Sequence, residues 1–168
     1  MDILTGIKGR RSIRKYSGRP VEEGKLLKIL EAGRFSPSAM NAQNRKLIVV
    51  KDENKREKLT KAIGQPFVGE APIILVCCGT EQRGVMRCGQ STHTVDVSIA
   101  TSYMILEAYE QGLGTCWLGN FDTKMVKEVL DIPEEVGVVA ITPIGYPAEA
   151  PYEKPRKELK EIVSYDKY

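Results

Sequence analysis

The feature that most constrains the fold is a long apolar segment between residues 94 and 111. Apolar side chains cover nearly the whole circumference of a helix there: Val95, Val97, Ile99, Ala100, Tyr103, Met104, Ile105, Leu106, Ala108 and Tyr109. A helix that is apolar all round is buried on all sides. In a chain of 168 residues, this predicts a central helix that also contacts a second subunit. A helix buried in the core of one subunit explains the pattern almost as well.

The remaining elements are predicted from shorter patterns. Apolar runs at residues 47–50, 72–78, 115–118 and 136–144 predict strands, and helical spacing predicts helices at 20–33, 51–62 and 122–130. With a short amphipathic stretch at the start, this order predicts an α/β or α+β sandwich. The tail, residues 148–168, is polar and interrupted by Pro151 and Pro155, so it cannot form a core by itself.

Composition excludes several classes of protein. The chain has 25 basic and 22 acidic residues, a balance that argues against general nucleic-acid binding. Its four cysteines and single histidine, His93, lack the spacing of a zinc site, and no metal is expected. No signal peptide is recognised, so we expect free thiols and a cytoplasmic location. The longest apolar run, 73–78, is too short to cross a bilayer.

The basic segment, residues 10–16, reads Arg-Arg-Ser-Ile-Arg-Lys-Tyr. Guanidinium groups bind phosphate oxygens in pairs, and a serine hydroxyl can add a further contact. The segment therefore predicts a phosphate site. A solvated basic turn and a nucleic-acid patch remain alternatives on local charge alone.

A second candidate is the loop at residues 35–43, which has neither helical nor strand periodicity. Its serine, asparagine and glutamine side chains offer donors and acceptors to a planar heterocycle. An ordinary connecting loop with a helix cap at Ser38 is an equal alternative. Residues 80–92 are predicted to form another loop. A dinucleotide-binding GxGxxG motif after a strand and a P-loop are both absent from the sequence.

The basic segment is followed by Ser-Pro-Ser-Ala-Met-Asn-Ala-Gln at 36–43, Gly-Leu-Gly-Thr-Cys-Trp-Leu-Gly at 112–119, Ile-Gly-Tyr-Pro at 144–147, and Arg156. In this order and spacing the motifs resemble the nitroreductase family of FMN-dependent oxidoreductases, in a short form. The resemblance implies an α+β sandwich whose central, mainly antiparallel sheet is flanked by helices. It also implies an intertwined homodimer with a long buried helix. Residues 1–168 would form one FMN-binding domain, with the tail, at about 148–168, as an arm that crosses to the partner.

The resemblance assigns cofactor contacts to four parts of the chain. They are Arg10, Arg11, Ser12 and Arg14; Pro37, Ser38, Ala39, Asn41 and Gln43; Trp117, Leu118 and Gly119; and Lys154 and Arg156. The basic segment and the tail would hold the phosphate and ribityl chain, with Arg14 near the pyrimidine edge of the flavin. The loop would reach the flavin partly from the other subunit, and residues 117–119 would lie near flavin N5. The chain departs from the family at Asn44-Arg45, where Pro-Trp is frequent, and this bears on the shape of the loop.

The implied activity is an oxidoreductase reaction that uses NADH or NADPH. Hydride would pass through flavin N5 in two ping-pong steps to a small electron-poor acceptor, such as a nitroaromatic or a quinone. No catalytic protein residue is expected, since the flavin carries the chemistry. Reductive dehalogenation and flavin fragmentation are alternatives on the same fold, as is a flavin-binding module without turnover. The expected partner is a second copy of the chain, without nucleic acid or membrane.

Overall fold

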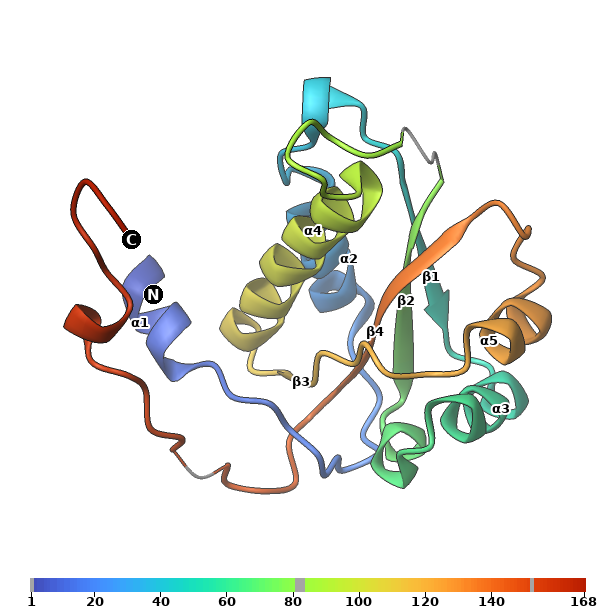
Figure 1. Cartoon of the computed structure of the whole chain (residues 1–168). Coiled ribbons are helices and arrows are strands. Elements are labelled where there is room, and N and C mark those ends of the chain that lie inside the picture. The colour runs from blue at the N-terminus through green and yellow to red at the C-terminus, as the bar shows by residue number, and fades with distance from the viewer. Residues whose placement is uncertain (1, 81–83, 152) are drawn as a thin grey trace.

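The core of the molecule is a four-stranded sheet with the strand order β1-β2-β4-β3 (Figure 1). The computed structural model describes residues 2–80, 84–151 and 153–168. The strands are β1 (Arg45–Val50), β2 (Ile73–Gly79), β3 (Gly114–Thr115) and β4 (Gly137–Gly145). Every pairing between these strands is antiparallel. The expected α+β fold with a mainly antiparallel central sheet is therefore confirmed.

Helices cover both faces of the sheet (Figure 1). The helices α2 (Glu23–Arg34) and α4 (Thr92–Glu110) lie on one face, and α3 (Glu53–Ile63) and α5 (Thr123–Leu130) lie on the other. The central strand β2 serves both layers because alternate side chains of a strand point to opposite faces. Ile73 and Leu75 pack toward α2 and α4, whereas Ile74 and Val76 pack toward α3 and α5. The predicted order of helices and strands is confirmed.

The long helix α4 is covered on one side only within a single chain. Val97 and Met104 are buried against α2 and the sheet. Tyr103, in contrast, is 45% exposed, and Ile99 and Leu106 are only half-buried. The alternative of a helix buried in the core of one subunit is therefore wrong for the described residues. The contact of α4 with a second subunit stays a prediction.

The predicted strand at 115–118 is shorter than expected. The ladder between β3 and β4 covers only Gly114–Thr115, and Leu118 then pairs with Ile141 in the same register. Cys116, between them, would lie opposite Pro143, which has no backbone N–H to donate to a ladder. Pro143 thus explains why the strand prediction is wrong for residues 116 and 117.

The basic segment is attached to the edge of the sheet. Ser12 forms a parallel bridge with Thr115, and the Ile13 N–H donates to the Thr115 carbonyl at 2.9 Å. The side chains of Ile13 and Tyr16 are buried, and Tyr16 pairs antiparallel with Pro147. Because these backbone contacts hold the basic segment along the edge of the sheet, its apolar side chains are buried and its cations remain at the surface.

Both ends of the chain lie on the same side of the molecule, away from the sheet (Figure 1). The helix α1 (Ile3–Gly9) precedes the basic segment, and the tail is exposed and irregular apart from a short 3-10 helix at Leu159–Glu161. Residues 81–83 of the predicted 80–92 loop, and residue 152 of the tail, lie outside the described residues. In the described part of the chain, the helices lack the length and hydropathy that a transmembrane segment requires.

Candidate functional site

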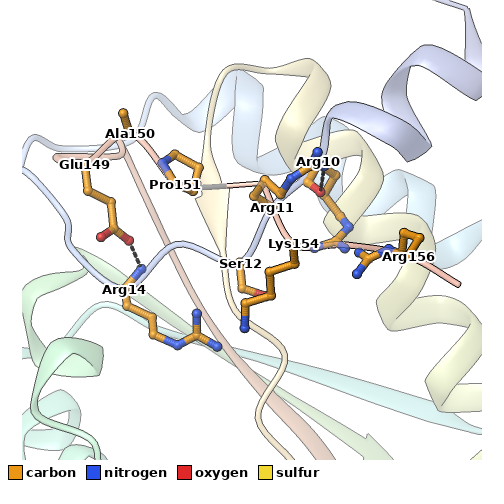
Figure 2. Close-up of a pocket in the computed structure, with 9 residues that line it drawn as sticks. All are labelled: Arg10, Arg11, Ser12, Arg14, Glu149, Ala150, Pro151, Lys154 and Arg156. Atoms are coloured by element: carbon orange, nitrogen blue, oxygen red, sulfur yellow. Dashed lines mark hydrogen bonds between the residues drawn. The ribbon is translucent and has the colours of Figure 1, made fainter.

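A cleft of about 220 Å³, here called the first cleft, lies between the basic segment and the tail (Figure 2). Six residues expected to bind the cofactor line it: Arg10, Arg11, Ser12, Arg14, Lys154 and Arg156. The tail reaches the cleft because its first residues pair with the basic segment. The Ala148 N–H donates to the Lys15 carbonyl at 2.9 Å, and the Ser17 N–H donates to the Tyr146 carbonyl at 3.0 Å.

Positive charge dominates the first cleft. Five cations line it, against one carboxylate, Glu149, among the described residues. Burial lowers the pKa of Arg10, and repulsion from Arg156 and Arg11 lowers it further. Like charges that approach one another in a partly buried site raise the free energy of the empty cleft. An anion with several oxygens would relieve this repulsion, so the first cleft is suited to a phosphate group.

The tail also brings two carboxylates to the basic segment. Glu149 accepts a hydrogen bond from the backbone N–H of Arg14 at 2.6 Å (Figure 2). Glu153 forms an ion pair with Arg11 at 3.1 Å, and the Arg11 guanidinium also donates to backbone carbonyls of Lys8 and Arg10. Arg11 therefore ties the tail to the end of α1. Sequence reasoning missed Glu149 and Glu153, because nothing distinguishes them from other surface acids.

A second cleft, of about 460 Å³, adjoins the first and shares Arg10, Ser12 and Arg156 with it. Its other walls are less polar: Ile7 of α1, Ser102, Ile105 and Leu106 of α4, and Trp117. The pair of clefts thus has a cationic end and a larger end with apolar side chains in its walls. This shape matches a ligand that carries a phosphate on one side and a flat ring on the other. Of these walls, only Trp117 was expected from the sequence.

The second group of expected site residues lies elsewhere in the chain. The loop that holds Pro37, Ser38, Ala39, Asn41 and Gln43 lies beyond the N-terminal end of α4, away from α1 and the tail (Figure 1). It is fixed to α4 by a hydrogen bond from the Ala39 N–H to the Asp96 carboxylate at 3.1 Å. One chain therefore does not bring this loop to the two clefts.

The residues at 117–119 lie closer to the clefts than the loop does. Trp117 lines the second cleft, and Leu118 is fixed by two backbone hydrogen bonds with Ile141, of 2.9 and 3.0 Å. Gly119 follows directly, and a Cβ atom there would lie 3.8 Å from the Trp117 ring nitrogen. The backbone at this position is therefore held firmly beside the apolar end of the site.

The side chains of Cys116 and His93 lie in surroundings that indicate a structural role. Burial raises the pKa of the Cys116 thiol, although Arg14 and a hydrogen bond from Ser12 oppose the increase. A thiol of this kind stays protonated and unreactive at neutral pH. His93 lies over the backbone of β2 and β4: a Cβ atom on Gly79 or Gly137 would come within 2.8 Å of its side chain. His93 therefore packs against the sheet, away from the two clefts.

Comparisons with known proteins agree with this fold. The nitroreductase family model matches residues 7–65 and 60–146. The chain is similar to an NADH dehydrogenase of Thermus thermophilus, at 32% identity over 97% of this chain and 95% of that protein. A nitroreductase family protein from Clostridium difficile 630 superposes with a TM-score of 0.90, at 32% identity over 100% of both chains. An FMN-dependent nitroreductase from Clostridium difficile R20291 has a TM-score of 0.84, at 31% identity over 99% of this chain and 100% of that chain.

Proposed function

Since the chain belongs to the nitroreductase family, we propose that it is an FMN-dependent oxidoreductase that takes electrons from NADH or NADPH. The electrons would pass in two separate half-reactions to a small electron-poor acceptor, such as a nitroaromatic or a quinone. The observation that carries this proposal is the junction, at Arg10, Ser12 and Arg156, of a cationic cleft with a larger cleft that has apolar side chains in its walls. An FMN molecule has the same division into a phosphate end and a ring end.

The residues of the first cleft would hold the phosphate end of FMN. Arg10, Lys154 and Arg156 would supply charge-assisted hydrogen bonds, and Ser12 would supply a hydroxyl. When bound, FMN supplies the hydride chemistry of the reaction at its N5 atom. The protein would then bind and orient both substrates and exclude water. Arg14 would stabilise negative charge at the pyrimidine edge of the ring, which favours the reduced form.

The proposed active form is a homodimer. The exposed side of α4, with Tyr103, is an apolar surface that a second subunit would cover. Ile3, Leu4 and Ile7 of α1 are also exposed, which is unusual for apolar side chains so close together. The loop at 36–43 of the second subunit would then complete the flavin site, and the tail would cross to that subunit. Residues 1–168 would act as one flavin-binding domain.

The first experiment is the visible absorption spectrum of the purified protein, before and after NADH or NADPH is added without oxygen. We expect oxidised flavin bands that bleach with at least one nucleotide. A protein that stays colourless after incubation with excess FMN would contradict the proposed function. Rates with nitroaromatic, quinone and haloaromatic acceptors would then identify the acceptor class.

The proposed cationic contacts with FMN are tested by the double variant Arg10→Ala/Arg14→Ala, which should lose its flavin during purification. Each charge-assisted hydrogen bond contributes about 1.5–3 kcal/mol, so losing two weakens binding by at least two orders of magnitude. The matched control is Arg19→Ala/Arg34→Ala, which removes two exposed arginines that pair with glutamates outside the clefts. Full flavin content in the Arg10/Arg14 variant would refute the roles of Arg10 at the phosphate and of Arg14 at the ring.

A further inference from the structure

The loop at residues 36–43, called loop 36–43 below, has a strained backbone. Met40, Asn41 and Gln43 have φ angles of 52°, 54° and 52°, in the left-handed region. Residues other than glycine rarely adopt this conformation, and strained positions of this kind cluster at functional sites. The Met40 side chain is 86% exposed, so its own packing does not hold the backbone in place. Hydrogen bonds within the loop support this conformation, from the Asn41 N–H to the Ser38 carbonyl and from the Gln43 N–H to the Ser38 hydroxyl, both at 3.0 Å. Contacts from outside the loop add to them.

Two charged side chains supply these contacts, one from each side of the loop. Asp96 of α4 accepts the Ala39 N–H at 3.1 Å, at the turn that precedes the strained residues. Arg45, the first residue of β1, donates to the Arg34 carbonyl at 2.8 Å and to the Ser36 carbonyl at 3.1 Å, where the chain enters the loop. The loop is therefore tied at its entry and at its middle by side chains that do not belong to it.

Asp96 is buried and Arg45 is half-buried, and both are only partly satisfied by the described residues. Asp96 is 3% exposed, and its Oδ2 atom has no hydrogen-bond partner; the same is true of the Nη1 atom of Arg45. Burial lowers the pKa of Arg45, and the negative charge of Asp96 acts in the opposite direction. The two charges are thus close enough to interact electrostatically. Burying such groups destabilises a fold unless they fix a geometry that other residues cannot fix.

We propose that Asp96 and Arg45 are positioning residues that hold loop 36–43 in its left-handed conformation, so that Asn41 and Gln43 are presented to the flavin. The part of this inference that concerns the flavin rests on the proposed function. The part that concerns the loop rests only on the contacts above. Arg45 is also one of the two residues at which this sequence departs from the Pro-Trp frequent in the family. A guanidinium therefore ties the loop entry where the family often has an aromatic side chain.

The test measures the loop and the cofactor separately. Hydrogen exchange of the FMN-free protein, read by mass spectrometry, reports on loop 36–43. Asp96→Ala removes the acceptor of the Ala39 N–H, and amide exchange in the loop should rise about ten-fold or more. Asp96→Asn keeps an oxygen for this N–H and should restore part of the protection. Unchanged loop exchange in Asp96→Ala would overturn the proposal, whatever the result with FMN.

The matched control is Asp122→Ala. Asp122 also accepts a backbone N–H, that of Met125 at 3.0 Å, but it does so at the start of α5, on the far side of the sheet. This variant should raise exchange at α5 and leave loop 36–43 and the dissociation constant of FMN unchanged. If Asp122→Ala weakened FMN binding as much as Asp96→Ala did, a general loss of stability would explain both, and the positioning role would be refuted.

The coupling of the two charges is tested by a double variant. Asp96→Asn and Arg45→Met should each weaken FMN binding about ten-fold, because each leaves the other charged group without its counterpart. The combined variant should lose less FMN affinity than the product of the two factors, because neither charge then remains in the interior.

Altered loop exchange with unchanged FMN affinity would refute the link to the flavin. Failure of the wild-type protein to bind FMN would refute the proposed function, and loop exchange would still decide whether Asp96 anchors the loop.

Discussion

A single methyl group added at Gly114 should disturb both the stability of the protein and its cofactor site. A Cβ atom at this position would lie 2.6 Å from Cγ1 and 2.8 Å from Cβ of Ile13. The Ile13 side chain cannot rotate away easily, because it is branched at Cβ and buried. Its backbone N–H is also bonded to Thr115, the next residue after Gly114. The basic segment must therefore shift as a whole in Gly114→Ala.

The size of the effect follows from this geometry. Extra atoms in a packed interior cost about 1–3 kcal/mol of unfolding free energy. For a chain of this length, 1 kcal/mol lowers Tm by about 2–4 °C, so Gly114→Ala should lower Tm by about 2–12 °C. Since Ser12 and Arg14 flank Ile13, FMN binding should also weaken.

Differential scanning calorimetry and flavin fluorescence titration measure the two effects. Gly24→Ala is the matched control, because in the described part of the chain no atom outside the neighbouring turns of α2 lies within 4 Å of the added methyl group. Alanine is the better helix former by up to about 1 kcal/mol, so this control should keep or raise Tm and leave FMN binding unchanged. A Gly114→Ala protein with wild-type Tm and wild-type FMN affinity would refute the reasoning.

Three other predictions concern surface groups, thiols and the tail. A hydrogen bond from Tyr146 lowers the pKa of Glu22 from 4.5 to about 2. The contribution of Glu22 to stability is therefore present above pH 4.5 and is lost as the pH falls toward 2, so Tyr146→Phe should flatten the dependence of Tm on pH in this window. Burial raises the pKa of Cys77 to about 12, whereas Cys88 is exposed, so a thiol reagent at pH 8 should label Cys88 first, and equally fast labelling of Cys77 would contradict this. Truncation after Tyr146 should yield monomers that lack flavin, as gel filtration and absorbance would reveal, and a stable dimer that retains flavin would refute the crossing arm.

Local patterns were sufficient to predict most elements of the fold. A continuous apolar run predicted β2, and helical spacing predicted α5. The predictions were wrong where a residue on another strand, distant in the sequence, determines the local structure. Pro143 interrupts the strand predicted at 115–118, but the pattern of that segment alone contains no information about which residue of β4 lies opposite.

The candidate site was predicted less completely, because it is assembled from distant segments. The first cleft exists because Ala148 pairs with Lys15, an interaction between opposite ends of the chain. The resemblance to a family indicated that Arg156 belongs with Arg10, whereas charge pattern alone did not. Glu149 and Asp96 were missed, since their roles depend on which backbone N–H they meet.

The exposed side of α4 links cofactor binding to assembly. Leu106 and Ser102 line the second cleft, and they lie on the part of α4 that other elements of the same chain leave open. In the proposed dimer, FMN and the second subunit would cover neighbouring parts of one surface. A ligand that binds only the assembled form stabilises that form, by about 2.7 kcal/mol at a hundred-fold excess over its dissociation constant. Removal of FMN should therefore weaken the dimer, and dilution of the dimer should release FMN, because linkage between two binding events is reciprocal.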